Sequence, residues 1–178
     1  PKSGNIQFVS DRDSKTLEFT MTHPDKVVAT MDETEKLFIF AEKPLAPVPE
    51  GISVLDYGAD PSGNTLSTLA IQSAIDKAPK GSTVRIPPGH YISGSLFIKS
   101  GISLFLEAGS LLQASGDPED FEPLQNAFIV VENAVGVAIK GIGAIDGSGA
   151  YLRHLTNDGG RLLSIRDSRQ VVVEDIIL

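Results

Sequence analysis

The stretch that decides the fold is SVLDYGADPSGNTLSTLAIQSAIDKAPKGSTVRIPPG, Ser53 to Gly89. It begins with Ser53–Tyr57, for which the sequence predicts an extended run. Apolar residues between positions 70 and 78 recur at spacings of one, three and four, which is typical of one face of a short amphipathic helix. We expect the side chain of Asn64 or Ser67 to cap the start of this helix.

Beyond this helix the sequence predicts only short strands, the first at Thr83–Ile86. The strands recur along the chain. One strand aligns Leu96–Gly101 with Phe128–Asn133 at an offset of 32, and the latter with Leu162–Asp167 at an offset of 34. The next strand aligns Ile102, Leu104 and Leu106 with Val135, Val137 and Ile139, and Val137 and Ile139 with Val171 and Val173; a third aligns Leu111–Ala114 with Ala144–Gly147. Earlier in the chain, Val84, Ile86, Gly89 and Tyr91 align with Leu104, Leu106, Gly109 and Leu111 at an offset of 20.

The repeat unit therefore holds three strands, and insertions near 115–127 and 148–160 lengthen it. Three short strands per repeat, each stacked on its counterpart, predict an all-β parallel β-helix in which neighbouring coils share one core. The helix at 70–78 would then cover the open N-terminal end. An ordinary β-sandwich with accidental periodicity is the alternative.

Stacking also predicts where side chains point. Leu104, Val137 and Val171 should form one interior file, because equivalent positions of successive coils lie above one another. The residues that follow the same strands, Glu107, Lys140 and Glu174, should then form one outward column of alternating charge.

The first 50 residues form a separate block. Residues 1–42 predict a small β-rich segment, either a partial sandwich or hairpins docked on the next domain, and 43–50 form a proline-rich linker. Residues 51–178 hold the coils. The strands expected in the first segment are Ile6–Ser10, Lys15–Met21, Lys26–Thr30 and Lys36–Ala41.

Composition narrows the classes of partner. The net charge of −8 argues against sequence-independent binding to nucleic acid, although a local basic cleft for an anionic sugar remains compatible with it. The chain has no cysteine, so it has neither disulfides nor thiolate metal sites, and its three histidines lack metal-ligand spacing. No apolar run approaches a membrane span, and no signal-like segment is present. We expect no cofactor, no metal and no membrane contact; the oligomeric state stays open.

Several motifs carry a family resemblance. They are Asp56-Tyr57-Gly58-Ala59, Ala70-Ile71-Gln72, Val84-x-Ile86-Pro87-x-Gly89-x-Tyr91, Gly94-Ser95-Leu96, Leu104-x-Leu106-Glu107-x-Gly109 and Gly143-x-Ile145-Asp146-Gly147-x-Gly149. Together they resemble the opening of pectin-degrading, right-handed parallel β-helix enzymes, and within them the polygalacturonase family of glycoside hydrolases (family 28). The resemblance covers residues 51–178 and implies a secreted protein, extracellular or periplasmic.

The resemblance implies inverting hydrolysis of α-1,4-galacturonan (pectin) or a related backbone. That mechanism needs two carboxyl groups ~6.5–9.5 Å apart, whereas neighbouring coils are only ~4.8 Å apart, so the pair must lie two coils apart or diagonally. The family's Asn-Thr-Asp, Asp-Asp, Gly-His-Gly and Arg-Ile-Lys signatures do not occur in the chain. We therefore expect the catalytic aspartates beyond Leu178, and the chain alone to be inactive. A non-catalytic polysaccharide-binding β-helix (adhesin or tailspike) and a related pectate lyase are the alternatives.

The best binding candidate is the loop that interrupts the repeat at 148–161, with Tyr151, Arg153, His154 and Arg161. Arginine and histidine suit a uronate carboxylate, and a tyrosine can stack on a sugar. A solvated loop is the alternative. No catalytic residue is assigned in this chain. Four further residues are expected to be structural: Asp56, Asp60 and Asp146 in turns, and His90 on the surface.

Overall fold

The computed structural model describes residues 7–11, 16–20, 25–31, 35–41, 47–121, 127–149 and 160–178. Its chain divides into two compact units, Pro1–Val48 and Pro49–Leu178.

The first unit holds two antiparallel hairpins. β1 (Gln7–Asp11) pairs with β2 (Thr16–Thr20), and β3 (Asp25–Met31) pairs with β4 (Glu35–Ala41). All four expected strands are present, and their ends differ from the prediction by at most one residue. The choice between a partial sandwich and docked hairpins stays a prediction.

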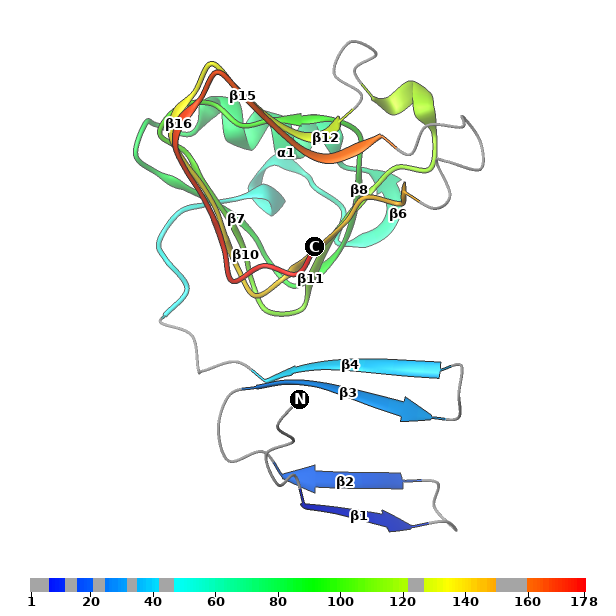
Figure 1. The fold of residues 1–178 in the computed structure, drawn as a ribbon. Coiled ribbons are helices and arrows are strands. Elements are labelled where there is room, and N and C mark those ends of the chain that lie inside the picture. The colour runs from blue at the N-terminus through cyan, green and yellow to red at the C-terminus, as the bar shows by residue number, and fades with distance from the viewer. Residues whose placement is uncertain are drawn as a thin grey trace. The chain divides into compact units, whose positions relative to one another are not determined.

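The second unit is a right-handed parallel β-helix with three sheets, as the repeats predicted (Figure 1). We call the sheets 1, 2 and 3 in the order in which the chain visits them in each coil. Sheet 1 holds β5 (Ile52–Ser53), β7 (Thr83–Ile86), β10 (Ser103–Leu106), β13 (Val135–Gly141) and β16 (Arg169–Glu174); sheet 2 holds β6 (Ser62–Leu66), β8 (Gly89–Ser93), β11 (Ser110–Ala114) and β14 (Ala144–Asp146); sheet 3 holds β9 (Leu96–Phe97), β12 (Ala127–Glu132) and β15 (Arg161–Arg166).

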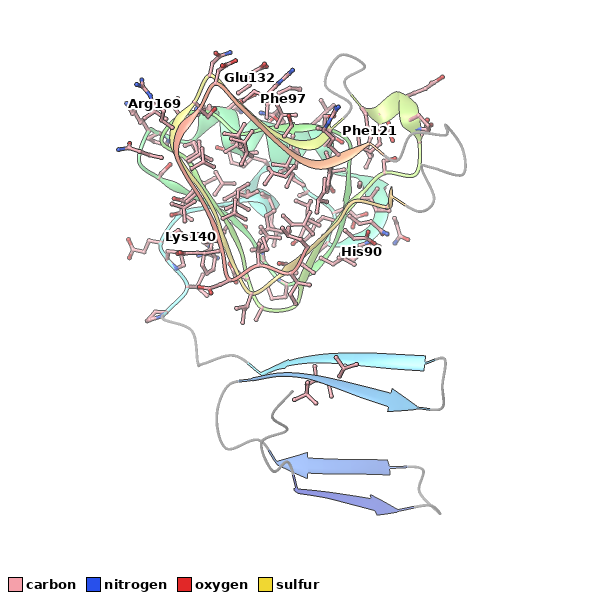
Figure 2. The ribbon with its side chains drawn as sticks, viewed as in Figure 1. His90, Phe97, Phe121, Glu132, Lys140 and Arg169 are labelled. Atoms are coloured by element: carbon pink, nitrogen blue, oxygen red, sulfur yellow. The ribbon has the colours of Figure 1, made fainter. Side chains whose placement is uncertain are left out.

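Aliphatic side chains fill the space between the three sheets (Figure 2). Leu104, Val137 and Ile139 are at most 1% exposed, while Val171 in the last coil is half-buried. Val137 pairs with Val171 as expected, but Leu104 pairs with Ile139. The predicted interior file is thus correct in direction and wrong by two residues at its first step.

The same two-residue shift breaks the predicted charge column. Lys140 is paired with Phe105 on one side and forms an ion pair with Glu174 on the other, with 2.6 Å between Lys140 Nζ and Glu174 Oε1. Glu107 instead accepts a hydrogen bond of 3.0 Å from Nε of Arg85, one coil earlier. Two separate ion pairs replace the expected ladder of three charges.

The start of the coil differs from the extended run expected at Ser53–Tyr57. Only β5 is extended, and Val54–Tyr57 form a 3₁₀ helix, η1. Oγ of Ser53 accepts the amide hydrogen of Leu55 at 3.2 Å, and Gly58 ends the helix with a φ of 85°. A serine cap before the turn and a left-handed glycine after it favour this tight helix over a strand.

The capping helix is α1 (Thr68–Lys77), with Ile71, Ala74 and Ile75 buried against the core. Ser67 lies at its N-cap, but its side chain makes no capping bond. Oγ of Ser67 accepts the amide hydrogen of Asp60 instead, at 2.9 Å. The expected side-chain cap was therefore wrong, because this hydroxyl holds the preceding turn.

A second face of α1 covers the free edge of β9. The side-chain amide of Gln72 accepts the N–H of Phe97 at 2.9 Å and donates to its carbonyl at 3.0 Å, as a neighbouring strand would. Thr68, one turn earlier, accepts the N–H of Gly94 at 2.7 Å, and Nζ of Lys99 donates to the carbonyl of Asp76 one turn later. Residues at i, i+4 and i+8 share a helix face, so one stripe of α1 satisfies the edge through the side chains of Thr68 and Gln72 and the backbone carbonyl of Asp76.

Candidate functional site

One corner of the coil differs from the other two. From β7 onward, the chain passes from sheet 1 to sheet 2, and from sheet 3 back to sheet 1, through short turns, whereas the longer segment between β5 and β6 includes η1. From sheet 2 to sheet 3 it makes a short turn after β8, but after β11 and β14 it makes long excursions, 115–126 and 147–160. Because strands of successive coils stack, both excursions leave the coil at this corner (Figure 1).

The described part of the first excursion is firmly held. The hydroxyl of Ser115 bonds the Asp120 carboxylate and accepts the N–H of Asp117 at 3.1 Å. Asp117 caps a single 3₁₀ turn, η2 (Pro118–Asp120). Gly94 lies so close beneath this turn that an added Cβ would be 1.9 Å from the carbonyl oxygen of Asp120.

Phe121, at the end of that described segment, is shown at the same corner in Figure 2. Its ring meets Phe128 of β12 edge-to-face, with 6.5 Å between the ring centroids and 70° between the ring planes. This aromatic contact packs Phe121 against the hydrophobic core and so anchors the loop to β12.

The second excursion begins with a tight turn at Asp146. Oδ1 of Asp146 accepts the N–H of Ser148 at 2.9 Å, and Ser148 has a φ of 49°. Oγ of Ser148 donates to the carbonyl of Ala114 one coil below, at 2.8 Å. Asp146 thus has the turn role that the sequence predicted for it.

The same Asp146 also ends a line of side chains on the outer face of sheet 2. Oδ2 of Asp146 accepts a hydrogen bond of 3.1 Å from Nε2 of Gln113, and Oε1 of Gln113 lies 2.7 Å from Nε2 of His90. We call these three residues the polar rail. It joins β8, β11 and β14, and therefore runs along the axis of the coil and across the strands.

His90 is accordingly half-buried and hydrogen-bonded, where the sequence suggested a plain surface residue (Figure 2). The sequence signal that could have revealed the rail is the spacing of the outward-facing positions. His90 pairs with Leu111, two residues before Gln113, and Gln113 pairs with Asp146. A glutamine can span that diagonal.

Asp60 is structural, as predicted. Its carboxylate accepts hydrogen bonds from the hydroxyls and the backbone amides of Ser62 and Thr65, all between 2.6 and 2.9 Å. These bonds, with the Ser62 hydroxyl foremost, hold the pKa of Asp60 well below its ordinary value. Asp56 is exposed in η1.

Of the four predicted binding residues, the structure describes one. Arg161 is the first residue of β15; it is exposed, pairs with Ala127 and lies where the second excursion re-enters the coil. It therefore lies at the corner that carries both excursions. Tyr151, Arg153 and His154 lie outside the described residues.

The part of the chain that the structure describes holds neither a cluster of metal ligands nor a membrane-spanning helix. Among its residues, no three His, Cys, Asp or Glu side chains gather as metal ligands. Within the same ranges there is also no helix of the length and apolarity that crossing a membrane requires.

Comparison with known proteins agrees with this geometry. Residues 51–117 match the family model described as rhamnogalacturonase A/epimerase, pectate lyase-like. The chain is 35% identical over 127 residues to a polygalacturonase of Ralstonia nicotianae, an alignment that covers 61% of this chain and 24% of the relative. It is 36% identical over 121 residues to an exo-poly-alpha-D-galacturonosidase of Dickeya chrysanthemi, covering 57% of this chain and 20% of the relative.

Among solved structures, the family 28 exopolygalacturonase of Yersinia enterocolitica shares the fold. The superposition has a TM-score of 0.60 and 21% sequence identity, and it covers 90% of this chain and 41% of the other. Residues 51–178 therefore form a right-handed parallel β-helix, the fold of that exopolygalacturonase. In sequence, the chain is similar to polygalacturonases. The chain spans about a quarter of the length of the curated relatives that it matches.

Proposed function

We propose that this chain is part of a glycoside hydrolase that cleaves a pectic polysaccharide, with α-1,4-galacturonan or a related backbone as substrate. The observation that carries the proposal is the sequence identity of 35% and 36% to a polygalacturonase and an exo-poly-alpha-D-galacturonosidase. The family model adds rhamnogalacturonan as the related backbone to be tested.

The coil geometry constrains the mechanism. Inverting hydrolysis uses one carboxylic acid to protonate the glycosidic oxygen and one carboxylate to activate a water, ~6.5–9.5 Å apart. Strands of adjacent coils lie ~4.8 Å apart, so the two groups belong to coils two apart or to diagonal positions. We assign neither group to a residue of this chain, and we propose that the present coils bind and align the polymer.

Within these coils, we propose that the long-loop corner binds uronate groups. Arg161 supplies a guanidinium that can bind a carboxylate through two hydrogen bonds, and it lies on a strand, so its backbone is held by the ladder with β12. Tyr151, Arg153 and His154 are proposed to act from the same excursion, the tyrosine by stacking on a sugar ring. A secreted location, extracellular or periplasmic, and a role in cell-wall degradation belong to the same proposal.

The test of activity measures reducing ends released from polygalacturonan and from rhamnogalacturonan by the whole protein that contains this chain, with and without a chelator. Chelator-insensitive release of saturated products is the expected result. Unsaturated products that need a divalent cation would identify a lyase, and unchanged ends with retained binding would identify a non-catalytic binder. Either of these outcomes rejects the hydrolase.

The test of binding uses the 178-residue chain and short oligogalacturonates. Arg161→Gln should weaken binding about tenfold, the usual effect of removing a hydrogen bond to a charged group. The matched control is Arg169→Gln on sheet 1, which changes another exposed arginine at the start of a strand, β16. Equal affinities of the two variants would reject the role of Arg161.

A further inference from the structure

The polar rail has a fixed pattern of donors and acceptors. Nε2 of Gln113 donates to Asp146, so the amide oxygen of Gln113 faces His90. That oxygen can only accept, and therefore Nε2 of His90 carries the hydrogen. On its other side the imidazole lies against Gly63, where an added Cβ would be 2.5 Å from Nδ1 of His90.

This arrangement leaves hydrogen-bonding capacity directed outward. Gln113 uses one of its two amide hydrogens on Asp146, and each carboxylate oxygen of Asp146 accepts one described bond and has a further lone pair. Asp146 is exposed and Gln113 is half-buried. The rail therefore offers a donor and two acceptors whose positions are already fixed by neighbours, which lowers the entropy cost of binding a ligand.

Aliphatic side chains share this outer face. Ile92 of β8 and Leu111 of β11 point outward beside the rail and are half-buried, and Leu66 of β6 is 48% exposed. An apolar floor next to a few fixed polar groups is the usual composition of a small-ligand site. Pyranose rings present both kinds of surface, with hydroxyls at the rim and C–H groups on the faces.

The charge on this face selects among sugars. The four strands of sheet 2 contain no lysine and no arginine, while sheets 1 and 3 carry Arg85, Lys140, Arg161 and Arg166. The ionised group on the rail is the carboxylate of Asp146. A uronate placed on the rail would face a like charge, whereas adjacent hydroxyls of a neutral sugar can donate to both of its oxygens.

We propose that the outer face of sheet 2 at His90, Gln113 and Asp146 is a subsite for a neutral sugar unit of the polysaccharide, distinct from the uronate-binding corner. The inference rests on the proposed function, since it assumes that a pectic polymer lies along the coil. It assigns the substrate class of this face: a branched or mixed pectin in which neutral sugars accompany galacturonate.

The test titrates the 178-residue chain with a short neutral galactan oligosaccharide and, separately, with an oligogalacturonate. Affinity is measured by calorimetry, and the side-chain signals of His90 and Gln113 are followed by NMR. The free chain should show the His90 ring with its hydrogen on Nε2 when neutral. The galactan should shift the His90 and Gln113 signals, and Asp146→Asn and Gln113→Leu should each weaken its binding about tenfold, the effect of losing one good hydrogen bond.

The matched control is Glu174→Gln, which removes one exposed carboxylate of sheet 1 and should leave galactan binding unchanged. Far-UV circular dichroism verifies that each variant folds. Unshifted His90 and Gln113 signals, stronger oligogalacturonate than galactan binding at these residues, or equal affinities of the Asp146 and Glu174 variants would each overturn the subsite. None of these results depends on whether the whole protein cleaves polygalacturonan. Failure of the subsite proposal can therefore be distinguished from failure of the proposed function.

Discussion

The edge contact of Gln72 gives the sharpest test of the fold. Replacing Gln72 with alanine removes both hydrogen bonds to Phe97 and the 2.9 Å bond to Asp76. Each neutral hydrogen bond contributes about 0.5–1.5 kcal/mol, and water can reach this part-exposed edge and replace some of that. We therefore expect Gln72→Ala to lower the free energy of unfolding by about 1–2 kcal/mol, or Tm by about 3–6 °C for a chain of this size.

Hydrogen exchange makes the prediction specific. The N–H of Phe97 bonds to Gln72, whereas the N–H of the next residue, Ile98, bonds to the carbonyl of Val130 on the other side at 2.8 Å. In Gln72→Ala the Phe97 amide should exchange faster than in the parent chain. The Ile98 amide should change only as much as global stability does, and so provides an internal control.

Two further variants separate hydrogen bonding from helix propensity. Gln72→Glu keeps the size but turns the donor facing the Phe97 carbonyl into a carboxylate oxygen, so it should destabilise more than alanine at neutral pH and recover when acidified. Leu69 lies on the same helix and is 83% exposed, so the free energy of unfolding of Leu69→Ala should stay within about 0.5 kcal/mol of that of the parent chain. If Gln72→Ala matched Leu69→Ala in stability and left the Phe97 amide unchanged, the role of Gln72 at this edge would be refuted.

Three other changes test single contacts. The hydroxyl of Tyr91 is buried and, within the described residues, has no hydrogen-bond partner, so Tyr91→Phe should leave the chain as stable or up to about 1 kcal/mol more stable in urea unfolding; a loss above that amount would contradict it. Because the pKa of Asp60 is lowered in the folded chain, the stabilisation that its carboxylate provides is complete above the unfolded-state pKa of about 3.9 and is lost as the pH falls below that value. The free energy of unfolding of Asp60→Asn should therefore depend less on pH in this acid range than that of the parent chain, and parallel profiles would count against this. Arg85→Gln should destabilise more than Lys140→Gln, because the Glu107 side chain left behind by the first is only 13% exposed, and equal thermal midpoints would be inconsistent with that burial.

Much of the β-helix follows from the sequence, because a three-strand repeat leaves few alternatives. The offset of 34 between β13 and β16 and the offset of 20 between β7 and β10 are both confirmed. In these strands more buried and more exposed positions alternate, so a shift by one residue would move the buried set to the outer face.

The offsets that were wrong have specific causes. Between β10 and β13 the register is two residues beyond the prediction, and a shift of two preserves the alternation, so the pattern cannot detect it. Between β8 and β11 it is one residue beyond the prediction, since Tyr91 pairs with Leu112 and not with Leu111. Between β9 and β12 it is also one residue beyond the prediction, with Leu96 paired to Ile129. Phe128 to Val131 are all buried, which leaves no alternation to define the register.

The candidate site was predictable in place but not in composition. Loop length located the corner at which Arg161 lies. The polar rail was not predicted, because His90, Gln113 and Asp146 belong to different coils and meet only when the register of sheet 2 is known. Each of them alone has an unremarkable local context in the sequence.

The restriction of long excursions to one corner has a practical consequence. Since the other two turns are short from β7 onward, added segments at 115–126 or 147–160 need not disturb any stacked ladder. Lengthening such a segment costs little chain entropy, about 0.6 kcal/mol for each doubling. The two positions are therefore suitable sites for grafted peptides, and foreign sequences inserted at both would leave the solenoid one coil apart.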